Sequence, residues 1–215
     1  MNTKFKQDLT NLARASYLPL AEAARYGETL GYKLDTELSR PNTMVFVDRS
    51  GQPVVAHRGS VTAKDWLVDD ALIAVGAHQN TDRLNLARSI TAATEIKYGR
   101  TANSVGHSLG GRLAEQSGSA GQIVTVNKAA GLGDIGRRQP SGTRQTDVRT
   151  RMDAVSAFSS LGRRPEIQGS SFGHDLCGAF GTSLYDSLRK KSRKDDAARV
   201  VVVYYFAFIP RENDP

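Results

Sequence analysis

The chain has 215 residues and a net charge of +7 at pH 7, and 39% of its residues are hydrophobic. This length supports one domain with its own core, and no run approaches the roughly 20 apolar residues of a membrane-spanning helix. The single cysteine, Cys177, excludes a disulfide framework within the chain. The start, MNTKFKQDL, lacks the apolar segment of a secretory signal. We therefore expect an intracellular, single-domain protein.

The first part of the chain predicts helices followed by a hairpin. Apolar residues recur at helical spacing over residues 8–32, with an interruption at Pro19. We accordingly assign residues 1–43 to an N-terminal helical region. The apolar runs Met44–Asp48 and Pro53–His57 flank a glycine-containing turn and predict two antiparallel strands.

Strands and helices alternate through the middle of the chain. Leu86, Ile90 and Ala93 mark one face of a helix that ends at Gly99. Further elements are predicted in the order strand, helix, strand and strand, at Thr101–Val105, Leu109–Ser117, Gln122–Asn127 and Asp147–Met152. This alternation predicts an α/β fold with a mainly parallel central sheet and flanking helices.

The last part of the chain predicts a helix, a basic segment and a final strand. Leucine and phenylalanine recur every four residues over Asp175–Leu188. The apolar run Val200–Ile209 predicts a strand that completes a sheet edge or pairs with a second copy of the chain. We therefore divide the domain into the helical region, a core over 44–188, and a basic segment with a terminal strand over 189–215.

The stretch GHSLG, centred on Ser108, matches the pattern of a nucleophile elbow. In such an elbow, a serine occupies a strained turn between a strand and a helix, where its hydroxyl is exposed at the helix N-terminus. Side chains two positions to either side would collide with this turn, so Gly106 and Gly110 suit it. The alternative is an ordinary glycine-rich turn.

The order of residues along the chain selects His174 as the catalytic base. In enzymes with this elbow the serine is followed by an acid and then by a histidine. His57, His78 and His107 all precede Ser108, which leaves His174. Without the serine, His174 would be interpreted as a histidine of a surface loop.

The catalytic acid is Asp153 or, as the second choice, Asp134. Asp153 follows a predicted strand at the end where open α/β sheets collect their functional groups. Asp134 lies in the loop after the preceding strand, while Asp147, Glu115 and Glu166 are less favoured. Each aspartate has the alternative interpretation of a turn or helix-capping residue.

Three segments together resemble the class 3 lipases, a fungal-lipase-like branch of the α/β-hydrolases. These segments are GHSLGG, the upstream VVAHRGSVTAKDW, and RTRMDAVSAF around Asp153. The resemblance covers roughly Met44 to Leu188 and implies an α/β-hydrolase-like three-layer sandwich. His57 stands where the family usually has an aromatic residue, and the segment for a long lid is short.

The resemblance implies a serine hydrolase for carboxylic esters, on acylglycerols or phospholipids, that needs no metal or cofactor. Ser108 would be the nucleophile, Asp153 the orienting acid and His174 the base. The Ser60 amide and hydroxyl and the Leu109 amide would form the oxyanion hole. The rival hypotheses are a catalytically inactive lipase-like binding module and a peptidase or thioesterase on the same scaffold.

Two further patterns carry less weight. GLGDIG, at residues 131–136, matches a dinucleotide-binding fingerprint, but Pro140 and turn-forming residues follow where a helix is required. Basic residues also gather in the second half of the chain, as a solvated surface or as a contact for anionic phospholipid, with nucleic acid disfavoured. These basic residues are Arg137, Arg138, Arg144, Arg149, Arg151, Arg163, Arg164 and the segment RKKSRK at 189–194.

Overall fold

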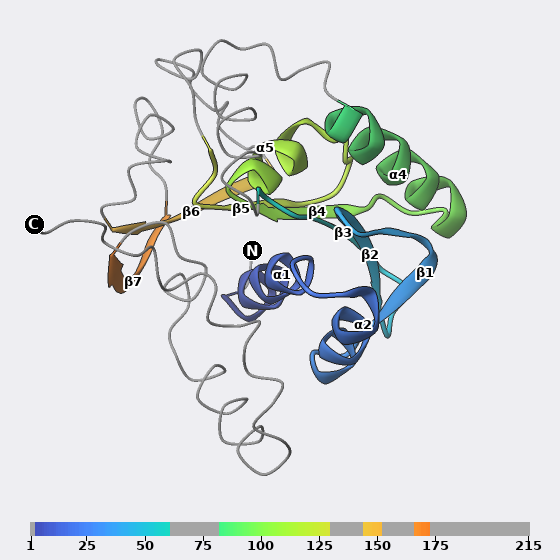
Figure 1. The fold of residues 1–215 in the computed structure, drawn as a ribbon, viewed down its shortest axis with the longest axis horizontal. Helices are drawn as coiled ribbons and strands as arrows, with labels where there is room; N and C mark the ends of the chain where they lie inside the picture. Colours follow the sequence, from blue (N-terminus) through green and yellow to red (C-terminus); the bar gives the residue numbers. More distant parts are fainter. Residues whose placement is uncertain (1–2, 61–81, 130–143, 152–165, 173–215) are drawn as a thin grey trace, which may run out of the picture. The chain divides into compact units, whose positions relative to one another are not determined.

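A computed structural model describes residues 3–60, 82–129, 144–151 and 166–172, and their strands form one sheet (Figure 1). All of these residues belong to the unit that spans Met1–Phe180. The strands lie in the sheet in the same order as in the chain. They are β1 (Tyr32–Arg40), β2 (Thr43–Asp48), β3 (Pro53–His57), β4 (Asn103–His107), β5 (Ile123–Val126), β6 (Gln145–Arg151) and β7 (Glu166–Phe172).

The sheet changes from antiparallel to parallel at β3. The pairs β1–β2 and β2–β3 are antiparallel, whereas every pair from β3–β4 to β6–β7 is parallel. Parallel neighbours need a crossover, and helices α4 (Asp82–Tyr98) and α5 (Leu109–Gln116) lie in the first two. The carboxyl ends of β3 to β7 consequently share one edge, and the predicted α/β class with a mainly parallel sheet is confirmed.

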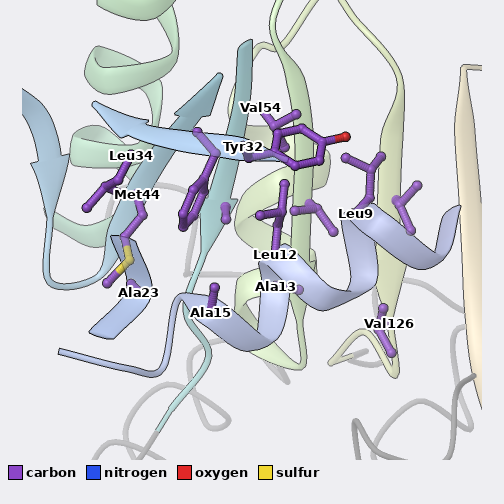
Figure 2. Packing of buried hydrophobic residues seen from close by; sticks show 14 of the residues in the cluster. Leu9, Leu12, Ala13, Ala15, Ala23, Tyr32, Leu34, Met44, Val54 and Val126 are labelled. Atoms are coloured by element: carbon purple, nitrogen blue, oxygen red, sulfur yellow. The ribbon is translucent and has the colours of Figure 1, made fainter. Parts of the chain in front are cut away.

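Helices cover both faces of the described sheet. Helices α1 (Thr3–Ala15) and α2 (Leu20–Thr29) pack on one face, while α4 and α5 pack on the other (Figure 1). Side chains alternate along β2 accordingly: Met44 (Figure 2) and Phe46 join the cluster under α1 and α2, and Val45 joins the cluster under α4. The two buried faces require two layers of helices, as the sequence alternation predicts.

Most predicted elements occur close to their predicted bounds. β3 has the predicted bounds, and β2, β4, β5, β6 and α5 lie within two residues of theirs. None of the helices in the described ranges is both long and apolar enough to cross a bilayer. The helix expected at 175–188 and the strand expected at 200–209 lie outside the described residues.

Two strands are absent from the prediction. The expectation that residues 1–43 are helical is wrong in part, because they contain β1 as well as α1 and α2. β1 mixes charged and apolar residues without strict alternation, so its sequence does not indicate a strand. β7 has the sequence EIQGSSF, whose glycine and serines are typical of a loop. Pairing with β6 supplies the context that turns this segment into a strand.

The buried face of α4 is broader than the predicted one. Ile90 is buried as expected, but Leu86 and Ala93 are only half-buried. Thr91 and Thr94 are buried beside Ile90 because each hydroxyl donates to the carbonyl one turn earlier, at 2.8 and 2.7 Å. The full buried set is Leu84, Ala87, Ile90, Thr91 and Thr94.

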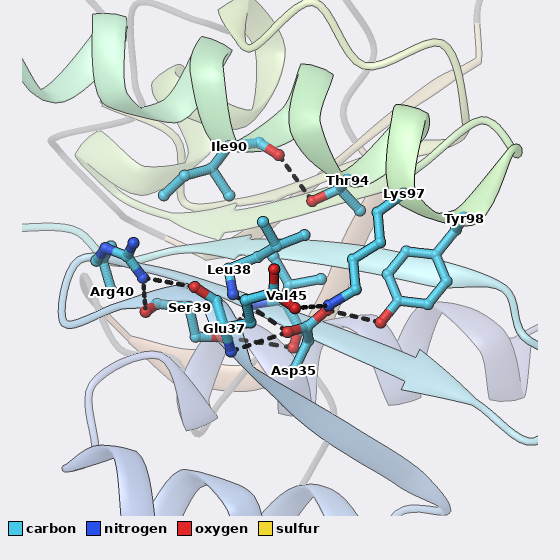
Figure 3. Close-up of polar contacts among 10 residues, drawn as sticks. All are labelled: Asp35, Glu37, Leu38, Ser39, Arg40, Val45, Ile90, Thr94, Lys97 and Tyr98. Carbon is cyan, nitrogen blue, oxygen red and sulfur yellow. Dashed lines mark hydrogen bonds and ion pairs between the residues drawn. The ribbon is translucent and has the colours of Figure 1, made fainter.

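A buried carboxylate on β1 fastens the antiparallel edge of the sheet to the end of α4 (Figure 3). Asp35 accepts a hydrogen bond from the Tyr98 hydroxyl at 2.7 Å and forms an ion pair with Lys97 at 2.7 Å. The backbone amides of Glu37 and Leu38 also donate to Asp35, at 3.0 and 3.1 Å. Burial alone would raise the pKa of Asp35, but these hydrogen bonds outweigh burial and lower the pKa.

We predict that Asp35→Asn lowers the free energy of unfolding at pH 7 by about 1–3 kcal/mol, because several donors lose an ionised acceptor. Because the pKa of Asp35 is lowered in the folded state, the ionised carboxylate stabilises the fold at pH values above its unfolded-state pKa. The loss of unfolding free energy in the variant should therefore shrink as the pH falls through the acidic range. Urea unfolding of the variant and the wild type at pH 7 and at pH 3 measures this difference in unfolding free energy. Glu37→Gln is the control, because Glu37 pairs with the same lysine but is exposed, and equal effects of both variants would contradict the prediction.

Candidate active site

Ser108 lies in a strained turn between β4 and α5. β4 ends at His107, α5 begins at Leu109, and Ser108 between them has φ 56° and ψ −126°. Among the described residues other than glycine, Ser108 shares a positive φ with Asn127. The amide of Ser108 donates to the Val126 carbonyl at 3.0 Å, which ties the turn to the end of β5. Such strain in a serine is typical of functional sites.

Close approach of three backbone segments explains the two glycines of the turn. A Cβ atom on Gly106 would lie 2.0 Å from the Gly110 carbonyl oxygen, and one on Gly110 would lie 2.1 Å from the His57 carbonyl oxygen. Both partner atoms belong to the backbone, so neither contact can be relieved by rotating a side chain. The first turn of α5 thus fits between the ends of β3 and β4 only with glycine at both positions.

The segment after β3 passes directly over this turn. A Cβ atom on Gly59 would lie 2.7 Å from the His107 carbonyl oxygen and 3.2 Å from Cβ of Ser108. Ser60, which is half-buried, follows Gly59. Leu109 is the first residue of α5, where backbone amides have no acceptor within the helix. Gly59 therefore lies against the turn of Ser108, with Ser60 next to it along the chain, and Leu109 directly follows Ser108.

Two side chains that the sequence analysis did not identify hold this segment. The Tyr17 hydroxyl accepts a hydrogen bond from the Gly59 amide at 3.0 Å and lies 2.9 Å from Nδ1 of His107. Arg83, in the first turn of α4, donates to the carbonyl oxygens of Arg58 and Gly59. Both residues lie far from the segment in sequence and belong to no motif, so only the fold brings them to the site.

His57 is a neutral core residue. Its Nε2 lies 3.1 Å from Oγ of Ser104, and its Nδ1 lies 3.4 Å from Oγ1 of Thr43. Burial and, secondarily, the charge of Arg83 lower the pKa of His57 to about 3. Both ring nitrogens are thus engaged inside the protein, in agreement with the exclusion of His57 as the base.

A cluster of charged residues joins the elbow helix to β6. Nζ of Lys128 lies 2.9 Å from Glu115 and 3.6 Å from Asp147, and Arg112 lies 2.7 Å from Glu115. The amide group of Gln145 donates to both carboxylates, at 3.1 and 2.6 Å. Arg112 and Lys128 are each 3% exposed, and the two cations balance the two anions. Glu115 and Asp147 therefore both take part in this cluster.

The remaining predicted site residues lie outside the described part of the chain. Asp153 comes two residues after Arg151, where β6 ends, and His174 comes two residues after Phe172, where β7 ends. Arg151 and Phe172 are register partners in these parallel neighbours. Asp134, Cys177 and most of the listed basic residues also lie outside the described ranges.

A family model described as a Tle-like phospholipase domain matches residues 16–178. No curated protein matches the chain by sequence. A fungal lipase–inhibitor complex is 16% identical over 70% of this chain and 71% of that one, with a TM-score of 0.44. Lip2 lipase from Yarrowia lipolytica is 15% identical over 79% and 77%, with a TM-score of 0.44. A Rhizomucor miehei lipase propeptide complex is 14% identical over 72% and 63%, with a TM-score of 0.46.

We predict that His57 makes the fold sensitive to mild acid. The folded-state pKa of about 3 is below the ordinary value of 6.5, so the unfolded chain binds a proton first as the pH falls. Stability from this residue is complete above pH 6.5 and is lost between pH 6.5 and 3, at about 1.4 kcal/mol per pH unit. Urea unfolding from pH 7.5 to 4.5 should show a shallower loss in His57→Gln than in the wild type, and parallel curves would refute the prediction.

Proposed function

Because the chain belongs to the Tle-like phospholipase domain family, whose model matches more than half of it, we propose that it is a serine hydrolase of lipid esters that acts through Ser108. The family agrees with the resemblance to lipases seen in the sequence and favours lipids over peptides or thioesters as substrates. A phospholipid or an acylglycerol is the proposed substrate, and a carboxylic ester is the bond that is cleaved.

The backbone geometry at Ser108 is the observation that carries this proposal. A φ of 56° costs a serine about 1–3 kcal/mol, and two glycines are required to accommodate the turn. The turn holds the serine at the N-terminus of α5, where amides and the helix dipole favour negative charge. A binding module without catalysis has no use for this strained serine, so the geometry favours an enzyme over that rival.

The register of β6 and β7 supports Asp153 and His174 as partners. Both residues stand two positions beyond a register pair of adjacent parallel strands, which lie about 4.8 Å apart. The carboxyl ends of β6 and β7 lie at the same edge of the sheet as that of β4, after which Ser108 follows. Three strand spacings, about 14 Å, separate β4 from β7, so the proposal requires His174 to come within hydrogen-bond reach of Ser108 across this distance.

The proposed reaction is acyl transfer in two steps. His174 takes the proton of Ser108 as its oxygen attacks the ester carbonyl, and Asp153 holds the imidazole in the required tautomer. The amides of Ser60 and Leu109 stabilise the oxyanion. The ester bond breaks as His174 protonates the leaving alcohol, and a water molecule activated by His174 then releases the fatty acid from Ser108.

Basic residues in the second half of the chain would attract the proposed enzyme to an anionic lipid surface. A cluster of lysine and arginine gains about 1 kcal/mol per residue near such a surface at low salt. The proposed contact is peripheral, through residues such as those of the segment at 189–194. Pairing of two copies through the strand expected at 200–209 stays a prediction.

We predict that a fluorophosphonate probe labels Ser108 and that Ser108→Ala abolishes both labelling and hydrolysis of phospholipid vesicles. His174→Ala should lower hydrolysis nearly as far, because the serine then lacks its base. Ser89→Ala is the control, since this serine is exposed on α4 and should keep full activity. A folded wild-type protein that resists the probe and hydrolyses no ester would support the inactive binding module instead.

We predict that Asp153→Asn lowers kcat by about 10³–10⁴-fold, because the base loses its orienting carboxylate. Asp134→Asn should lower kcat much less. Steady-state hydrolysis of a short-chain nitrophenyl ester by both variants compares them directly. The reverse order of the two losses would assign the acid to Asp134.

A further inference from the structure

The amide of Ser60 has to be held in a fixed direction if it is to bind an oxyanion. Catalytic geometry tolerates errors of only about 0.5 Å, yet Ser60 lies on a segment beyond the end of β3. A hydrogen bond from the Arg58 amide to the Asn42 carbonyl, at 3.0 Å, fixes the beginning of this segment. The next two peptide units are held by side chains from other parts of the fold.

Tyr17 and Arg83 contact the peptide unit between Arg58 and Gly59 from opposite sides. This unit presents its carbonyl at Arg58 and its N–H at Gly59, and the two groups of a trans peptide point in opposite directions. Arg83 donates to the carbonyl and the Tyr17 hydroxyl accepts from the N–H. Rotation of this peptide unit would break both hydrogen bonds at once.

Tyr17 also links this peptide unit to the nucleophile turn. Burial raises the pKa of Tyr17, so the hydroxyl keeps its proton. Because the oxygen accepts from Gly59, the proton of Tyr17 is available to Nδ1 of His107, at 2.9 Å. One hydroxyl thus connects the segment after β3 with the residue before Ser108. This link fixes the distance between the segment that carries Ser60 and the turn that carries Ser108.

Arg83 also acts on the peptide unit that carries the Ser60 amide. Nη2 of Arg83 lies 3.4 Å from the Gly59 carbonyl oxygen, and that carbonyl and the Ser60 N–H belong to the same peptide unit. A cation at the carbonyl polarises the unit and makes its N–H a stronger donor. The charge of Arg83 also contributes, after burial, to the lowered pKa of His57, the last residue of β3.

We propose that Tyr17 and Arg83 are positioning residues that orient the oxyanion hole, with Arg83 also polarising the Gly59–Ser60 peptide. The inference rests on the proposed hydrolase function and deepens it. It makes the segment between α1 and α2 and the first turn of α4 part of the catalytic apparatus. Both residues act on the backbone of the segment that leads to Ser60, so their loss should act on the transition state through the Ser60 amide.

The test compares Tyr17→Phe, Arg83→Met and Arg83→Lys with matched controls. Tyr98→Phe removes a hydroxyl that binds Asp35, away from the site. Arg88→Met removes another α4 arginine that donates to a backbone carbonyl, that of Gln116 at 3.2 Å. The measurements are kcat and KM on a short-chain nitrophenyl ester, and the inhibition constant of an alkyl boronic acid, which forms a tetrahedral adduct with a serine.

Loss of an oxyanion donor costs about 10²–10³-fold in kcat, so we expect a smaller loss, of about 10–100-fold, in Tyr17→Phe and Arg83→Met. KM should stay within about twofold, and boronic acid affinity should fall in parallel with kcat/KM, because both report transition-state binding. Arg83→Lys should recover part of kcat, since lysine keeps one donor and the charge. Both control variants should keep the wild-type kcat.

Wild-type kcat and wild-type boronic acid affinity in both Tyr17→Phe and Arg83→Met would overturn the inference, as would a rise in KM alone. Thermal unfolding checks that each variant is folded, and if Arg83→Met does not fold, Tyr17→Phe decides the question. Failure of the underlying function looks different, because the wild type itself would then neither hydrolyse the ester nor react at Ser108.

Discussion

The close approach of α5 to the ends of β3 and β4 is the constraint on which the rest of the site depends. Gly110 lies against the His57 carbonyl and Gly106 lies against Gly110, so the serine between them is forced into a left-handed conformation. Hydrogen bonds compensate for the strain: the Ser108 amide donates to β5, and its carbonyl accepts from Gly111 and Ala129 at 3.0 and 3.1 Å. Without these contacts the chain would relax out of the turn, and Ser108 would no longer be held at the N-terminus of α5.

The carboxyl ends of the parallel strands bring the proposed catalytic groups to one edge of the sheet, and the antiparallel strands β1 and β2 extend the sheet on the side of β3. β4, β6 and β7 end just before Ser108, Asp153 and His174, which is the arrangement expected at the carboxyl ends of an open α/β sheet. The antiparallel strands carry no proposed catalytic residue. Helix α2 packs on β1, whereas α1 packs on β3, β4 and β5. Tyr17, between the two helices, reaches the site from this face of the sheet.

Local patterns predicted the centre of the fold well and its edges poorly. The elbow, the hairpin and the alternating strands follow from glycine spacing and runs of apolar residues, which are short-range signals. β1 and β7 escaped prediction because their charged, glycine and serine residues form strands only when paired with a neighbour. Tyr17 and Arg83 could not be found from the sequence, because each acts on a backbone group that is distant along the chain.

The ion cluster behind the elbow bears on how this protein responds to ionic strength. Arg112 and Lys128 are almost fully shielded from solvent and are matched by Glu115 and Asp147, so dissolved ions screen their attraction only weakly. The framework that presents the serine should keep its shape from dilute buffer to concentrated salt. A change in turnover during a salt titration would then report on the encounter with a charged lipid surface and not on a rearranged catalytic centre.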